Sequence, residues 1–150
     1  MRIWILAGLA LLVGAFLYFR PDGYAVSKID PAGVARVEIS RPGARPVVIE
    51  RVGGSWRLAG SGKVDGAAMA RLLSVLRARS DRSIEPGDLS RFGLDKPVLS
   101  LTFDGNRLDF GMINPLTGQQ YLHSGNRVYL VSAQYALIPA PKEARHAGTP

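Results

Sequence analysis

The chain has 150 residues, no cysteine and a formal net charge of +7 at pH 7. The lack of cysteine excludes a disulfide framework, a thiol nucleophile and a thiolate metal site. This length allows one ordinary domain after the apolar N-terminal stretch. The basic net charge favours anionic partners, such as lipid headgroups or acidic glycans, over neutral partners. Alternatively, the positive charge serves only to keep the protein soluble.

The N-terminus carries an apolar run from Ile3 to Phe19, which is bracketed by Arg2 and Arg20. As a helix this run would be about 25 Å long, close to the hydrocarbon thickness of a bilayer, which is about 30 Å. A cleaved signal peptide, with small residues at 13–15 as the cleavage point, is the competing interpretation. The apolar run continues past that point, so we predict a retained transmembrane helix within residues 1–20.

Charge around this segment predicts its orientation. Arg2 and the α-amino group make the N-terminal flank positive, which keeps that end in the cytoplasm and sends residues 20–150 into the periplasm of a bacterial inner membrane. Trp4 and Tyr18 lie near the two ends of the run, where aromatic rings favour the headgroup region. We therefore expect these two side chains at the membrane interfaces.

Small residues form a stripe on the predicted membrane helix. Ala7, Ala10 and Gly14 recur at helical spacing, and Ala10 and Gly14 are four residues apart. Such a stripe lets a second helix approach closely, although alanine and glycine are also common in membrane helices in general. We treat these three residues as the candidate docking face for an integral membrane partner.

Residues 21–33 are predicted to be a short tether, and an antiparallel meander follows them. Alternation of apolar and polar residues with period two predicts its strands, and turns rich in glycine and proline separate them. Trp56 is expected to pack into the core. The three strands are expected at residues 34–40, 46–52 and 55–58.

One soluble helix follows the meander. Asp65 is a suitable N-cap residue, and the leucine-rich stripe Met69, Leu72, Leu73 and Leu76 has helical spacing. This stripe predicts an amphipathic helix packed on the sheet.

Three arginines, Arg71, Arg77 and Arg79, lie off the apolar stripe of this helix. These arginines could simply form a basic surface that is exposed to solvent. The alternative is that they contact an anionic partner.

The second half predicts a four-stranded meander. A helical turn is expected near residues 86–89, Gly93 would end it in the left-handed conformation, and Pro97 would start the next strand. Asp104-Gly105 between alternating runs predicts a hairpin. The strands are expected at 98–103, 107–112, 119–123 and 127–132, with a last helical turn at 133–137.

These elements predict an α+β fold: one N-terminal transmembrane helix, then a small domain of antiparallel β-meanders with one amphipathic helix packed on the sheet. The predicted boundaries are an anchor at 1–20, a tether at 21–33, an extracytoplasmic domain at 34–137 and a flexible tail at 138–150.

Motifs for catalysis do not assemble in the sequence. Gly60-Ser-Gly-Lys63 lacks the first glycine and the hydroxyl residue of a phosphate loop. His123 has no second histidine at zinc-binding spacing and is expected to be satisfied or on the surface. Asp104 and Asp109 could be considered as a glycosidase pair, but Asp104 is better explained as turn chemistry. We therefore predict no enzyme activity, no cofactor and no metal site.

The order of motifs resembles a known bacterial family. Phe92-Gly-Leu-Asp-Lys-Pro97, Phe110-Gly111, Gln120-Tyr121-Leu122 and Val128–Val131, preceded by Trp56 and Val64-Asp65, are similar to the domain-of-unknown-function 4340 family. The resemblance implies a membrane-anchored envelope protein of a kind often encoded beside ABC-type gliding or auxiliary transporters. It carries over no catalytic residues.

Together these observations predict a non-enzymatic, single-pass membrane accessory subunit that makes protein–protein contacts in an inner-membrane complex. Integral membrane proteins and membrane lipid are the expected partners, with no nucleic acid and no small-molecule substrate. The alternative is a membrane-anchored module that binds anionic envelope lipid or cell-wall glycan.

Overall fold

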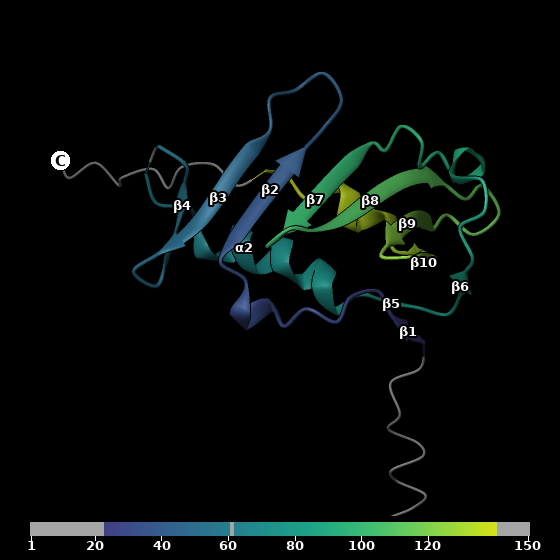
Figure 1. Cartoon of the computed structure of the whole chain (residues 1–150), viewed down its shortest axis with the longest axis horizontal. Coiled ribbons are helices and arrows are strands. Elements are labelled where there is room, and N and C mark those ends of the chain that lie inside the picture. Colours follow the sequence, from purple (N-terminus) through teal and green to yellow (C-terminus); the bar gives the residue numbers. More distant parts are fainter. Residues whose placement is uncertain (1–22, 61, 141–150) are drawn as a thin grey trace, which may run out of the picture.

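An antiparallel sheet of eight strands forms the body of the protein in a computed structural model, which describes residues 23–60 and 62–140 (Figure 1). Every neighbouring pair in this sheet is antiparallel. In spatial order the strands are β4 (Ser55–Leu58), β3 (Val47–Val52), β2 (Arg36–Ser40), β7 (Leu99–Phe103), β8 (Asn106–Ile113), β9 (Gln120–Ser124), β10 (Arg127–Val131) and β6 (Ser83–Ile84).

Pairing of β2 with β7 joins the two meanders into this one sheet. Val37 lies opposite Phe103 and Ile39 opposite Leu101, and all four side chains are buried. Burial of apolar pairs on one face specifies the register, because a slip of one residue would turn them toward water.

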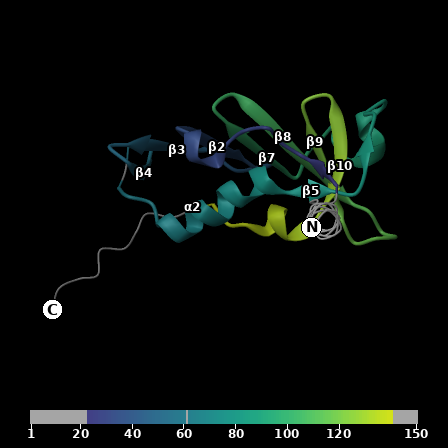
Figure 2. The same ribbon diagram turned by 90° about the horizontal axis from the view of Figure 1, so that it is seen from below.

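The helical layer covers one face of the sheet. Helix α2 (Gly66–Leu73) begins after Asp65, whose carboxylate accepts hydrogen bonds from two backbone N–H groups of the first turn, as the sequence predicted. Met69 and Leu72 are buried, and the chain continues as the 3-10 helix η2 (Ser74–Arg77). Figure 2 shows α2 and the yellow C-terminal segment, which includes η4 (Ala133–Leu137), on the same side of the sheet.

A two-stranded ribbon lies beside the main sheet, at the end where the described chain begins. Strand β1 (Tyr24–Ala25) pairs with β5 (Arg79–Ser80). The Ser80 hydroxyl accepts a hydrogen bond of 3.0 Å from the N–H of Leu130 and so ties the ribbon to β10. Val26, the next residue of the N-terminal segment, is 2% exposed and belongs to the core.

Two further 3-10 helices are η1 (Pro31–Gly33) and η3 (Leu89–Phe92). The side chain of Asp88 caps η3, where a hydrogen bond from the Ser90 hydroxyl, then one from the Ser90 backbone N–H, lowers the pKa of Asp88 below its ordinary value, with the charge of Arg91 adding to the effect. Gly93 ends η3 with φ 66°, the left-handed conformation predicted for it.

The predicted α+β class is wrong. The described residues are mostly antiparallel β sheet with a single short α-helix of eight residues. The stripe that predicted a longer helix winds into the tighter η2 from Ser74 onward. Two short strands that the sequence did not predict, β5 (Arg79–Ser80) and β6 (Ser83–Ile84), follow the helical segment. The seven strands of the two predicted meanders are confirmed, and none of their ends differs from the prediction by more than two residues.

The predicted transmembrane helix lies outside the described residues. Within residues 23–60 and 62–140, none of the helices has the length and apolar character needed to cross a bilayer.

Candidate binding groove

A groove of about 560 Å³ lies at one end of the sheet, where three segments meet. The N-terminal segment 25–29 forms one wall. The β7–β8 turn with the start of β8 and the β9–β10 turn form the others. Its lining consists of Ala25, Val26, Ser27, Lys28, Ile29, Gly105, Asn106, Arg107, Leu108, Asp109, His123, Ser124, Gly125, Asn126 and Tyr129.

The groove has an apolar floor and a polar rim. Val26 and Leu108 are buried core residues, and Ile29 and Tyr129 pack partly against the same core. Lys28 is exposed on the wall that residues 25–29 provide. This combination of an apolar base with a few polar side chains is typical of a small-molecule site.

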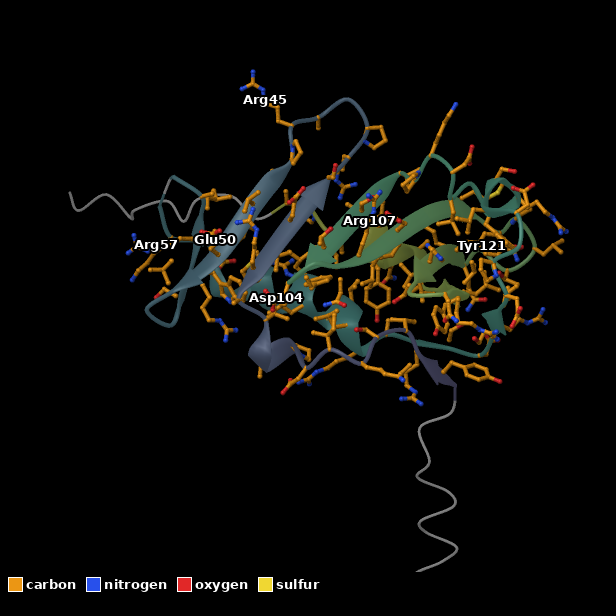
Figure 3. All side chains as sticks on the ribbon, viewed as in Figure 1. Arg45, Glu50, Arg57, Asp104, Arg107 and Tyr121 are labelled. Atoms are coloured by element: carbon orange, nitrogen blue, oxygen red, sulfur yellow. The ribbon has the colours of Figure 1, made fainter. Side chains whose placement is uncertain are left out.

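The acidic side chain of the groove is neutralised from within the sheet. Arg107 Nε donates to Asp109 Oδ1 at 2.7 Å, and Arg107 Nη2 donates to the Ser100 hydroxyl at 3.1 Å. Ser100 in turn donates to the Asp109 carboxylate. Arg107 lies on the sheet surface in Figure 3. Because the Asp109 charge is paired, it does not repel an anion in the groove.

Ser100, Asp109 and His123 lie side by side on three adjacent strands, which brings together the residue types of a hydrolytic triad. The order is wrong for that chemistry, since the histidine must lie between serine and carboxylate in order to take the serine proton. Here Asp109 is in the middle and receives the hydroxyl hydrogen directly. Ser100 is therefore part of a structural network and is not arranged as an activated nucleophile.

The carboxylates of Asp104 and Asp109 are held by different partners. Asp104 accepts hydrogen bonds from the backbone N–H groups of Ala35 and Arg36, the shortest at 2.8 Å. It is also the one described non-glycine residue with positive φ, at 47° in the β7–β8 turn. Figure 3 places Asp104 at that turn and Arg107 on the strand that follows. The interpretation of Asp104 as turn chemistry is confirmed.

The predicted basic set lies on a different part of the surface. Arg71, Arg77 and Arg79 are all exposed along α2, η2 and β5. Arg71 Nε reaches the carbonyl of Ala67 at 3.5 Å, and Arg79 Nη2 donates to the carbonyl of Gly23. Their contact with an anionic partner stays a prediction.

His123 lines the groove, a position that no spacing in the sequence indicated. Within the part of the chain that the structure describes, no cluster of three or more His, Cys, Asp or Glu residues could hold a metal ion.

The sites predicted in the N-terminal segment fall outside the described residues. These are the helix-docking stripe of Ala7, Ala10 and Gly14 and the interface residues Trp4 and Tyr18.

The motif Phe92–Pro97 folds over a β-bulge in β8. The register of β8 against β9 shifts between Phe110 and Ile113. A Cβ added at Gly111 would be 2.2 Å from the carbonyl oxygen of Phe92 and 2.9 Å from Leu94. Gln120 Nε2 donates to the Gly111 carbonyl at 2.8 Å, and the rings of Phe92 and Tyr121 are 4.9 Å apart. The motif is thus a structural unit.

Apolar side chains that are exposed gather around the β8–β9 loop, a feature that sequence reasoning missed. Met112 and Ile113 are half exposed, and Leu116 is 92% exposed. The loop is nevertheless well hydrogen-bonded: Asn114 N–H donates to the Gln119 carbonyl at 2.7 Å, and Asn114 Nδ2 donates to the Tyr121 hydroxyl at 3.1 Å. A braced loop that presents leucine to solvent is typical of an interaction surface.

Over the described residues, the fold and these features define a domain of one eight-stranded antiparallel sheet and a two-stranded ribbon, with one short α-helix, a polar groove at one end and an apolar loop. Residues 56–146 match the family model described as Domain of unknown function (DUF4340), so the chain belongs to this family. The resemblance stated from the motifs is confirmed. No curated protein and no solved structure matches the chain.

Proposed function

We propose that this chain is a non-enzymatic, single-pass accessory subunit whose domain makes protein–protein contacts in a bacterial inner-membrane complex. The observation that carries the proposal is the apolar β8–β9 loop. Leu116, at 92% exposed, is the extreme case. Exposed apolar groups that are held in place favour association, because burying them against a partner removes them from water without a large ordering cost.

The non-enzymatic part of the proposal is supported by the polar side chains that could act in catalysis, because they are engaged in hydrogen bonds within the sheet. Ser100 and Asp109 are engaged with each other and with Arg107, and Asp104 is engaged with backbone N–H groups. These groups stabilise the sheet, which favours a binding role over a chemical one.

Membrane attachment is the remaining part of the proposal. It is supported by the uncharged run Ile3–Phe19 and by the positive flank at Arg2, which favour a cytoplasmic N-terminus and a periplasmic domain. The described chain begins at Gly23, a few residues after this run, so the domain would lie close to the membrane surface. A transporter-associated complex fits this location.

The test is a mild-detergent pull-down of the full chain through a C-terminal tag, with quantitative mass spectrometry and native-gel migration. Leu116→Glu is expected to reduce recovery of the partner about tenfold or more, because it places a charge in the apolar contact. Val52→Glu is the matched control, since Val52 is also exposed (54%) but lies on β3.

Equal partner recovery for wild type, Leu116→Glu and Val52→Glu would contradict docking through the β8–β9 loop. In the same assay Gly14→Leu tests the predicted membrane-embedded stripe, and unchanged migration of that variant would argue against it.

A further inference from the structure

We propose that the groove between residues 25–29 and the turns of the β7–β8 and β9–β10 hairpins binds the phosphate group of a phosphate ester. Lys28 would supply the charge, and Asn126 and Tyr129 would supply further polar contacts. The proposal goes beyond the accessory role, because it gives the same domain a ligand.

The charge of the groove favours an anion. Among the described residues Lys28 has no ion-pair partner, whereas Arg107 and Asp109 compensate each other at 2.7 Å. The groove therefore holds one uncompensated positive charge and no uncompensated negative one. An anion entering it meets attraction without repulsion from a free carboxylate.

The polar groups surround the space from different walls. Lys28 comes from the N-terminal segment, Asn126 from the β9–β10 turn and Tyr129 from β10. The side chain of His123 is not part of this set, because His123 pairs with Asp109 and therefore lies on the opposite face of the sheet from Tyr129, which pairs with Leu122. The side chains of Lys28, Asn126 and Tyr129 form no hydrogen bond to another described residue, so their polar groups are available to a ligand. Donors on several sides suit the three terminal oxygens of a phosphate ester better than the two coplanar oxygens of a carboxylate.

The size and floor of the groove select an ester over inorganic phosphate. A volume of about 560 Å³ lies within the range of small-molecule sites and far exceeds one phosphate group. Val26 and Leu108 form a buried apolar base, with the half-buried Tyr129 ring beside them. The carbon part of the ester would lie against this base.

The phosphate ester has two sources, a lipid headgroup or a soluble metabolite. Residues 25–29 follow the apolar N-terminal run closely, which brings the groove within reach of headgroups if the proposed membrane attachment holds. The lipid source rests on that attachment, and the soluble source does not.

The experiment is an NMR titration of the isotope-labelled full chain in dodecyl maltoside micelles with glycerol 1-phosphate, and with glycerol as the phosphate-free control. The amides of His123, Asn126 and Tyr129 are expected to shift with the ester and not with glycerol. Lys28→Gln should weaken binding about fivefold, the value of one charge contact near a surface, and Tyr129→Phe about threefold.

Lys63→Gln is the matched control, because Lys63 is exposed beside β4, away from the groove. Its affinity should equal that of wild type. The unchanged remainder of the amide spectrum confirms that each variant is folded.

The second arm replaces the micelle with phosphatidylglycerol nanodiscs and adds no soluble ester. Shifts of the same three amides in the nanodiscs identify the lipid headgroup as the ligand, and shifts that need glycerol 1-phosphate identify a soluble ester. The proposal is overturned if neither condition moves them, or if Lys28→Gln and Lys63→Gln bind equally. Partner recovery in the pull-down is measured separately, so each proposal fails on its own readout.

Discussion

Gly111 lies directly beneath the backbone of the Phe92–Pro97 motif. Any side chain at this position would overlap the Phe92 carbonyl oxygen, which is 2.2 Å from an added Cβ. The glycine of the Phe110-Gly111 pair is therefore required by close approach of two backbone segments and not by its own φ angle, which is not positive. Its partner motif includes Gly93, whose φ of 66° turns the chain toward Leu94.

Gly111→Ala is predicted to destabilise the full chain by about 2–3 kcal/mol. Overpacking of a tight contact costs about 1–3 kcal/mol, and the upper part of that range applies because the obstacle is backbone. Urea unfolding in maltoside micelles measures the loss as a lower midpoint at unchanged slope.

Gly66→Ala serves as the control. Gly66 opens α2 at a negative φ with nothing within 4 Å of an added Cβ. Alanine there should leave stability unchanged or raise it by up to about 1 kcal/mol, because alanine favours helix. A loss of stability in Gly66→Ala as large as that in Gly111→Ala would contradict the steric explanation.

At the scale of elements, the β7–β8 turn is tied to the start of β2. The Asp104 carboxylate accepts hydrogen bonds from the Ala35 and Arg36 N–H groups, residues 69 and 68 positions away in the sequence. The Asp104 N–H also donates to the Arg36 carbonyl at 3.0 Å. One turn residue thus fixes both its own hairpin and the junction between the two meanders.

Asp104→Asn is predicted to cost about 1–2 kcal/mol of unfolding free energy. Asparagine tolerates the positive φ at this position. It replaces the charged carboxylate, which has two acceptor oxygens, with a neutral amide that has one, and hydrogen bonds to charged groups are stronger than those to neutral groups. Thermal unfolding of the full chain measures the effect.

Asp95→Asn is the matched substitution for that measurement. Asp95 is exposed, and the structure gives it no hydrogen bond to a described residue. Asp95→Asn should change the free energy of unfolding by no more than about 0.5 kcal/mol. If Asp104→Asn behaved the same way, the Asp104 carboxylate would not be holding the meanders together.

At the scale of the whole molecule, the two meanders share one core. The side chains of β2, β3, β7 and β8 contribute to the same cluster as Met69 and Leu72 of α2. Since neither meander has a separate core, neither should persist after the other unfolds.

We therefore predict a single cooperative unfolding transition. Trp4→Phe leaves Trp56 of β4 as the one tryptophan of the chain, so fluorescence reports the first meander and far-ultraviolet circular dichroism reports the sheet. The two urea midpoints should coincide. A fluorescence transition that precedes the dichroism transition would show that the meanders unfold independently.

The candidate site was much less predictable than the fold. The sequence draws attention to Asp104, Asp109 and His123 only as catalytic or metal residues, and it gives no reason to expect Lys28 or Asn126 in a binding site. The groove exists because residues 25–29 meet two hairpin turns from the second half of the chain. No local sequence pattern predicts that these distant segments contact one another. The exposure of Leu116 was missed for a related reason, since loop length alone does not say which side chains stay uncovered.

The sequence by itself determined the strands of both meanders, the Asp65 and Gly93 helix ends and the family. These features depend on alternation, turn residues and caps, which act within a few positions along the chain. Only the tertiary structure decided that β2 pairs with β7, that β1 pairs with β5 and that β6 closes the far edge. Those pairings, and the groove they create, join segments more than 40 residues apart, where burial against a shared core decides which neighbours meet.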